Sequence, residues 1–478
     1  MARFIQAVQE MSKGVICMKK NVLAKSILST LLVGGMVAVQ MGTGFAADPQ
    51  NGMGAYTVAG GKLAEGRFSL AAGEDATVSG KDSTGAIAIG MDAKASGNSA
   101  ITIGTMSEAQ GGFSTVLGGF SKITADSGKD SGSSVLVGGF SGIKNSTYAI
   151  GMGYATEITD SNAAIAIGTG SQVRALPYTG SLKMGDPEKD KAVKVINVKN
   201  GEVTSVDPTT DTAEALIKRN GKGYGAIAIG QRASSHMLGA VSVGLYATSA
   251  GMESISMGSG SVTTGNYGVG MGSHVTVSGD SAIALGKQAG ASAASAVAMG
   301  KEAEASGERA IAIGALTTAS GEGSVVIGSH RPGYTGYGST ASGKSAVAIG
   351  DNVQVSGSET VAIGTKLKVA AENAVVMGYN AGASDKAYYG VALGYESNVN
   401  NYSGVAIGKS ASAERESSVA VGEGATAAGV HSLAMTAYAQ ANDAFSIAIG
   451  RQAEVGLPAY QEKDKHLGGA SNGGIAIG

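Results

Sequence analysis

A short unit of alternating small and large residues recurs along most of this chain. One period runs from Lys301 to Gly314 and contains two alternating segments. In the first, Ala303 and Ala305 alternate with glutamates, which is typical of a short strand with one solvent-exposed face and one buried face. The second segment, residues 310–313, is apolar at all four positions. This pattern predicts a strand that is covered on both of its faces.

Glycines end the second segment at a regular spacing. They recur every 14 residues from 230 to 328, and the same spacing returns over 350–378 and 394–422. Thr436 takes the next position, and Gly450 restores the series. Two short strands and two glycine turns per period predict one coil of a parallel β-solenoid, with glycine supplying turns of positive φ. About two dozen coils, stacked about 4.8 Å apart, predict an all-β rod on the order of 100 Å long.

The two-faced strand raises the question of which face lies inside the coil. We expect the larger residues inside, because the interior needs volume; this predicts a core of Ile87, Ile89, Ile101, Ile103, Ile283, Leu285, Val297, Met299, Ile311, Ile313, Val347 and Ile349. The small residues then face outward and form an exposed seam of Ala282, Ala284, Ala296, Ala298, Ala310, Ala312, Ala346 and Ala348. An apolar stripe of this length is larger than monomers leave in water, so it predicts self-association.

The composition supports a repetitive fold and excludes several others. The chain has 77 glycines and no tryptophan, and only 5% of its residues are aromatic, so a core filled by large rings is not expected. Calcium-binding nonapeptide rolls need an aspartate in each turn, which these turns lack, and hexapeptide helices repeat every 6 residues. Glycine at this frequency also excludes helical repeats.

The N-terminal 46 residues have the features of an export signal. Five basic residues face one acidic residue there, and an apolar stretch over 27–39 is too short and too glycine-broken for a transmembrane span. We therefore predict a signal peptide over 1–46, with Met18 as an alternative start. The chain's single cysteine, Cys17, would be removed with it, so the mature chain would contain no disulfide.

The repeat units resemble those of a known family. Residues 281–286 (Ser-Ala-Ile-Ala-Leu-Gly), 295–300 (Ser-Ala-Val-Ala-Met-Gly) and 345–350 (Ser-Ala-Val-Ala-Ile-Gly) are similar to the head repeats of YadA-like trimeric autotransporter adhesins. The resemblance covers roughly residues 85–478. It implies a left-handed parallel β-roll from each of three chains, packed as a homotrimeric head that binds host cells or extracellular-matrix proteins. It also implies display at the outer membrane of a diderm bacterium.

The repeats are interrupted, and this divides the chain into segments. A lead-in over 47–84 precedes repeats over 85–170 and 226–478, and residues 171–225 depart from the period. Part of this insertion, 193–203 followed by 212–216, resembles the family's neck motif, although the usual Asp-Ala-Val-Asn ending is replaced. A plain loop insertion is the alternative. No heptad stalk or membrane barrel strands follow, and the sequence stops within the repeats, so we expect a truncated piece of a longer protein with its anchor elsewhere.

Candidate chemistry is sparse. The five histidines are scattered, no metal, nucleophile or phosphate-loop motif occurs, and no basic stripe is available for nucleic acid. We therefore predict no catalysis, no cofactor and no small-molecule substrate. One enlarged loop places His330, Arg331, Tyr334 and Tyr337 on a projection that suits ligand contact, with an ornamental insertion as the alternative. The predicted function is an adhesin head, and the alternative is a structural surface fibre or surface-layer component.

Overall fold

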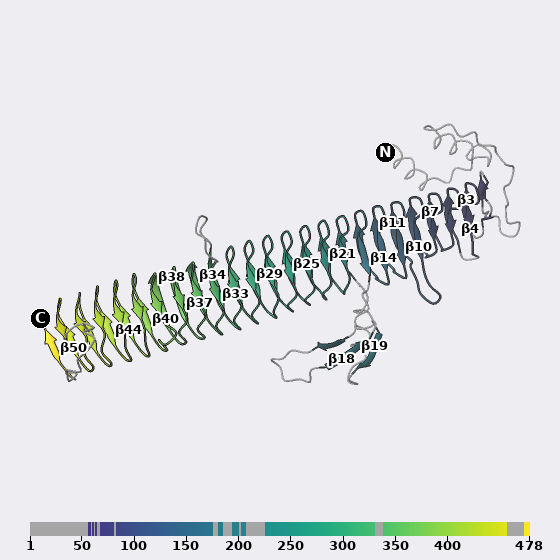
Figure 1. Cartoon of the computed structure of the whole chain (residues 1–478). Helices are drawn as coiled ribbons and strands as arrows, with labels where there is room; N and C mark the ends of the chain where they lie inside the picture. The colour runs from purple at the N-terminus through teal and green to yellow at the C-terminus, as the bar shows by residue number, and fades with distance from the viewer. Residues whose placement is uncertain are drawn as a thin grey trace, which may run out of the picture.

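The computed structural model describes a single elongated stack of β-coils (Figure 1). The described residues are 67–80, 83–174, 225–329, 338–456 and 473–478, together with the short stretches 56–58, 60–61, 63–64, 180–184, 194–199 and 202–206. Within these ranges every regular element is a strand. The prediction of an all-β parallel solenoid with a period near 14 residues is confirmed, and the stack has about 23 turns.

Each coil contributes one strand to each of two long parallel sheets. Sheet A has 25 strands: β1 (Tyr56–Val58), β3 (Leu70–Ala72), β5 (Ile87–Ile89), β7 (Ile101–Ile103), β9 (Thr115–Leu117), β11 (Val135–Val137), β13 (Ile150–Met152), β15 (Ile165–Ile167), β20 (Ile227–Ile229), β22 (Val241–Val243), β24 (Ile255–Met257), β26 (Val269–Met271), β28 (Ile283–Leu285), β30 (Val297–Met299), β32 (Ile311–Ile313), β34 (Val325–Ser329), β36 (Val347–Asp351), β38 (Val361–Thr365), β40 (Val375–Tyr379), β42 (Val391–Leu393), β44 (Val405–Ile407), β46 (Val419–Val421), β48 (Leu433–Met435), β50 (Ile447–Ile449) and β52 (Ile475–Ile477).

Sheet B is built from the shorter strand of each coil. Its members are β2 (Leu63–Ala64), β4 (Thr77–Val78), β6 (Lys94–Ala95), β8 (Glu108–Ala109), β10 (Lys122–Thr124), β12 (Gly142–Lys144), β14 (Glu157–Thr159), β16 (Gln172–Arg174), β21 (Ser234–Ser235), β23 (Thr248–Ser249), β25 (Val262–Thr263), β27 (Thr276–Val277), β29 (Gly290–Ala291), β31 (Glu304–Ala305), β33 (Thr318–Ala319), β35 (Thr340–Ala341), β37 (Gln354–Val355), β39 (Lys368–Val369), β41 (Gly382–Ala383), β43 (Asn398–Val399), β45 (Ser412–Ala413), β47 (Thr426–Ala427), β49 (Gln440–Ala441) and β51 (Glu454–Val455).

Residues at equivalent positions of consecutive coils lie side by side. Ile311 pairs with Val325, and Ala312 pairs with Val326. Each residue is thus paired with the equivalent residue of the next coil. The stack also continues across the insertion, because β15 pairs with β20 and β16 pairs with β21. The insertion therefore leaves the rod after Arg174 and returns within one coil. Strand β16 belongs to the rod, although the sequence placed its residues inside the insertion.

The interior of the rod is lined by small residues, so the predicted inside and outside of sheet A are reversed. All eight alanines predicted as a seam (Ala282, Ala284, Ala296, Ala298, Ala310, Ala312, Ala346 and Ala348) are fully buried within the single chain. The residues predicted as core point outward and are partly or largely exposed: Ile87, Ile89, Ile101, Ile103, Ile283, Leu285, Val297, Met299, Ile311, Ile313, Val347 and Ile349.

The reason for this reversal is the narrowness of a 14-residue coil. At β26, where Val275 and Val277 fill the interior from sheet B, the facing positions are Gly268 and Gly270. A Cβ atom at Gly270 would lie 2.7 Å from the Thr263 hydroxyl and 3.3 Å from a Val275 methyl. An interior that has no room for a single methyl group at such a coil cannot hold two isoleucines per coil.

The two glycine positions of each coil serve different purposes. Gly314 adopts the predicted positive φ, at 121°. Gly307 does not, but a Cβ there would lie 2.1 Å from the carbonyl oxygen of Gly321 in the next coil, so close stacking of the backbones requires glycine. The left-handed turns fall instead on Glu302 and Arg309, with φ of 55° and 57°.

Several coils between 118 and 168 depart from the 14-residue period. The corner glycines Gly118, Gly138, Gly153 and Gly168 are separated by 20, 15 and 15 residues. Larger side chains fill the interior of these coils. The extra volume of the Leu136 side chain is balanced by its partner in the next coil, Gly151, which has no side chain. A Cβ at Gly151 would lie 2.7 Å from a Leu136 methyl.

The insertion contains its own small sheet. Strands β17 (Gly180–Met184), β18 (Lys194–Lys199) and β19 (Glu202–Val206) are antiparallel, with an irregularity between Asn197 and Val198. This sheet pairs with no described strand of the rod. At the N-terminal end, the segment predicted as a lead-in already forms coils, since β3 pairs with both β1 and β5. The predicted signal peptide lies outside the described residues.

Candidate adhesive and assembly surfaces

An aliphatic surface runs along the whole rod on the outer side of sheet A. It consists of the first and third residues of each sheet A strand, and we call it the apolar face. Ile, Val, Leu or Met fill these positions in almost every coil, with Thr115 as an exception. Many of them are strongly exposed for aliphatic side chains, such as Ile103 at 41% and Met299 at 38%. The predicted apolar ladder therefore exists, but isoleucine, valine and methionine form it in place of alanine.

The outer side of sheet B has the opposite character. Most of its outward positions, which we call the polar face, carry charged, amide and hydroxyl side chains: Lys94, Glu108, Lys122, Glu157, Gln172, Ser234, Thr248, Thr276, Glu304, Thr318, Thr340, Gln354, Lys368, Asn398, Ser412, Thr426, Gln440 and Glu454. Gly142, Val262, Gly290 and Gly382 occupy the same position in other coils. Consecutive coils align these groups, as where Lys94 pairs with Glu108 and Glu304 pairs with Thr318. The rod thus presents one apolar face and one polar face over its full length.

Aromatic side chains gather at the corners beside the apolar face. Near the N-terminal end, the rings of Phe120 and Phe140 stack at 4.8 Å, and Tyr154 follows at 5.5 Å from Phe140. Near the other end, Tyr379 stacks on Tyr395 at 5.2 Å. All five rings are exposed. The two stacked pairs lie face to face along the rod, whereas Tyr154 is tilted against Phe140.

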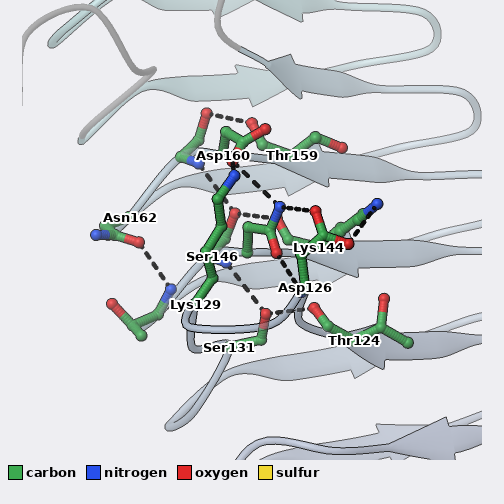
Figure 2. Close-up of polar contacts among 12 residues, drawn as sticks. Thr124, Asp126, Lys129, Ser131, Lys144, Ser146, Thr159, Asp160 and Asn162 are labelled. Atoms are coloured by element: carbon green, nitrogen blue, oxygen red, sulfur yellow. Dashed lines mark hydrogen bonds and ion pairs between the residues drawn. The ribbon is translucent and has the colours of Figure 1, made fainter.

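A polar cluster holds the enlarged coil that follows Gly118 (Figure 2). Lys144 pairs with Asp126 and Lys129 pairs with Asp160, each at 2.9 Å. The Asn145 amide nitrogen donates to Asp126 at 2.9 Å and to Asp160 at 3.2 Å, and its oxygen accepts from the Asp126 backbone at 2.8 Å. Hydrogen bonds from Asn145 and Lys144 lower the pKa of Asp126, and the bond to Asp160 raises the pKa of Lys129. These contacts fasten the loop around residues 125–130 to the two coils that follow.

Buried serines bind the same coils to one another. The Ser131 hydroxyl accepts from the Ser146 amide at 3.2 Å, and the Ser146 hydroxyl accepts from the Ser161 amide at 2.9 Å. Each hydroxyl also donates to a backbone carbonyl, as Ser146 does to Lys144 at 2.8 Å. The sequence analysis missed this feature. The sequence does contain a signal for these coils, because the spacing between their corner glycines changes from 14 to 20 and 15 residues.

A buried histidine lies where the insertion leaves the rod. His236 is 8% exposed; its Nε2 atom lies 2.7 Å from the Ser234 hydroxyl and its Nδ1 atom 3.2 Å from the carbonyl oxygen of Arg174. Burial lowers the pKa of His236, and the contact with the Arg174 carbonyl opposes this shift. Met237, the next residue along the chain, packs with Ala240 and Met252 in a small buried cluster.

The predicted ligand-contact loop cannot be placed against these surfaces. His330, Arg331, Tyr334 and Tyr337 lie outside the described residues, so their role stays a prediction. Across the part of the chain that the structure describes, no three His, Cys, Asp or Glu side chains are grouped so that they could hold a metal ion. The same part contains no helix long and apolar enough to span a membrane.

A family model matches the C-terminal half of the rod. The model is described as a YadA head domain repeat in two copies, and it matches residues 278–303, 305–330, 335–352, 341–366, 370–397, 386–411, 400–425 and 416–435. The chain carries YadA head domain repeats. YadA head repeats are typical of adhesin-type proteins of the cell surface. No curated protein matches the chain. The N-terminal coils, outside the matched residues, continue the same two sheets.

Proposed function

We propose that this chain is the head of a surface adhesin that attaches a bacterium to host cells or to the extracellular matrix. The chain would be exported through residues 1–46 and displayed as a homotrimer, without catalysis. The observation that carries the proposal is the combination of YadA head repeats with a rod that has one continuous apolar face.

The apolar face supports the homotrimer. An aliphatic ladder of this length is far larger than the patches that monomers leave in water. Three chains that turn their apolar faces toward a common axis would cover it completely. The interface is cyclic, so it closes after three copies instead of growing into a fibre.

The polar face supports the adhesive role. In such a trimer the sheet B ladders point away from the axis and remain accessible. Their repetition at intervals of about 4.8 Å allows many weak contacts along one rod, and multivalent contact raises overall avidity without any single strong site. We therefore expect recognition to be distributed over the polar face, with the loop at 330–337 as an additional contact.

Binding of the mature chain to immobilised collagen, fibronectin and epithelial cells tests this function. We expect saturable binding that weakens when Glu304, Thr318 and Thr340, which are consecutive on the polar face, are replaced by alanine. A Tyr334→Ala, Tyr337→Ala variant measures the contribution of the loop separately. Absence of binding to every surface, together with regular arrays in electron micrographs, would favour a structural surface layer instead.

A further inference from the structure

One corner of the rod is enlarged between β41 and β42. The step between the corner glycines Gly378 and Gly394 is 16 residues, two more than the regular period. The additional residues lie in the turn that leads from sheet B to sheet A. This turn is fastened to the next coil, because the Ser384 hydroxyl donates to the backbone carbonyl of Asn400 at 2.7 Å. The enlarged turn is therefore an ordered part of the rod.

Three tyrosines gather at this corner. Tyr388 and Tyr389 lie in the enlarged turn, and Tyr402 lies in the equivalent turn of the next coil. The three residues are 41%, 55% and 45% exposed, in that order. The ring centroids of Tyr389 and Tyr402 lie 5.6 Å apart, with the ring planes at 80°. Because the planes are nearly perpendicular, the two rings do not lie flat on each other.

The tyrosines at the opposite corner are arranged differently. The ring planes of Tyr379 and Tyr395 are only 8° apart, so each ring covers one face of the other. That pair stabilises itself by stacking within the rod. The corner with Tyr389 and Tyr402 instead leaves aromatic surface open to a ligand.

Asparagines lie directly beside these tyrosines. Asn398 and Asn400 flank the buried Val399 and therefore point outward on the polar face. The Asn398 amide nitrogen donates to the side-chain oxygen of Asn400 at 2.8 Å. The Asn401 side-chain oxygen accepts from the Tyr402 backbone amide at 2.9 Å. Among the described residues, the Asn398 oxygen and the Asn400 and Asn401 nitrogens make no hydrogen bond.

The corner thus combines open aromatic rings with amide groups that are held in place but not fully used. We call these six residues the corner patch: Tyr388, Tyr389, Asn398, Asn400, Asn401 and Tyr402. One face of a sugar ring carries C–H bonds that pack on an aromatic ring, and its hydroxyls both donate and accept hydrogen bonds. The corner patch offers a partner to both kinds of group.

Charge and size narrow the class of ligand. The corner patch contains no charged side chain, and the neighbouring Asp385 and Lys386 have opposite charges, so a polyanion finds no positive surface here. The patch comprises six residues on two consecutive coils, whereas a stable protein interface contains about 20–30 residues on each side. A small uncharged ligand fits these limits better than a folded protein.

We propose that the corner patch binds a neutral oligosaccharide. Tyr389 and Tyr402 pack on sugar rings, and the free amide groups of the asparagines bond to sugar hydroxyls. This inference rests on the proposed adhesive function and adds one specific site to the contacts distributed over the polar face. Asn398 and Asn400 lie on the side of the rod opposite to the apolar face, so a trimer that covers the apolar face leaves them accessible.

Binding of the assembled mature chain to immobilised neutral oligosaccharides of galactose, mannose and N-acetylglucosamine tests the proposal. We expect Tyr402→Ser and Asn400→Ala each to weaken binding by about fivefold or more, because each removes a direct contact. Both variants install residues that the fold accepts at equivalent positions, Ser358 and Ala428. Tyr395→Ala, at the opposite corner, is the matched control and should bind like the unaltered chain.

Other results would overturn the corner patch. Equal binding by all variants would place the saccharide elsewhere, and stronger binding to heparin would identify a polyanion site. A smaller particle in light scattering for Tyr402→Ser would assign this tyrosine to assembly. Dependence on Tyr402 for binding fibronectin whose glycans have been removed would identify a protein ligand.

The adhesive function can be judged separately on the same samples. A chain that binds cells or matrix proteins but no neutral oligosaccharide would overturn the corner patch and leave the proposed function intact. A chain that binds none of these surfaces would overturn both.

Discussion

Thr436 stacks on Gly450 at the corner after consecutive sheet A strands, and it holds a φ of 88° at a position that glycine fills in the coils on either side. The Gly450 amide donates to the Met435 carbonyl over 3.2 Å, whereas the Gly422 amide, two coils earlier, donates to the Ile407 carbonyl over 2.8 Å. Positive φ is strained for a β-branched residue. This corner therefore holds backbone strain at the one described coil where its glycine is missing.

Restoring that glycine should stabilise the rod. We expect Thr436→Gly to raise the free energy of unfolding of the C-terminal coils by about 1 kcal/mol, because it removes backbone strain. Gly300→Ala should do the reverse by at least that amount, since its Cβ would lie 2.4 Å from the Gly314 carbonyl oxygen. Thermal unfolding measures both. Gly290→Ala is the control, because no atom lies within 4 Å of the added methyl group; an equal loss there would refute the steric explanation.

Substitutions on the two sides of one strand should have different effects. Ala312→Leu places three more carbons in the narrow interior and should destabilise the chain by about 1–3 kcal/mol. Ile313→Ser, on the adjacent outward position, should leave the circular dichroism spectrum unchanged but weaken self-association in sedimentation experiments. The opposite result, with a tolerated leucine at 312 and an unfolded Ile313→Ser chain, would restore the original assignment of the two faces.

The loop around residues 125–130 should detach when Asn145 is removed. Asn145→Ala deletes the amide that links Asp126 to Asp160, so we expect faster proteolysis within this loop and unchanged protection of sheet A. Acid should act in the same direction. The pKa of Asp126 is lowered in the folded chain, so its contribution is present above the ordinary carboxyl pKa of about 3.9 and is lost as pH falls through the lower folded value. Protection that is independent of pH between 6 and 3 would contradict this account.

His236 should make the base of the insertion sensitive to mild acid. Burial lowers its pKa, so its contribution to stability is complete above the ordinary value of about 6.5 and is lost as pH falls through the lower folded value. We expect hydrogen exchange in β21 to be faster at pH 5 than at pH 7 after correction for intrinsic rates. His236→Ser, which installs the residue found at the equivalent positions 278 and 306, should remove that difference. If the difference persists in the variant, another group causes it.

The architecture was readable from the sequence because the corner glycines report the coil length directly. Each corner glycine lies where a side chain would collide with the next coil, as at Gly300. The number of residues between consecutive corner glycines is therefore the length of one coil. The parallel sheets, the 14-residue period and the existence of an apolar outer ladder all follow from it. The fastening of the 125–130 loop was missed because it depends on contacts between residues 18 to 31 positions apart.

The prediction assigned the inner and outer faces of sheet A the wrong way round. Alternation of small and large residues distinguishes the two faces but does not show which one lies inside. The decisive information was the width of the interior. Ala303 and Ala305 already line it from sheet B, and a coil closed by small residues on one side leaves room only for small residues on the other. Ala310 and Ala312 meet this requirement, while Ile311 and Ile313 do not. It was correct to assign the inside by side-chain volume. The interior is narrow, however, so the smaller residues lie inside and the larger ones outside.

The molar mass of the purified mature chain in solution, measured by light scattering, tests the central claim most directly. The account predicts a particle of three chains, because the outward ladder of isoleucine, valine and methionine needs to be covered. A stable, soluble, fully folded single chain at micromolar concentration would contradict it.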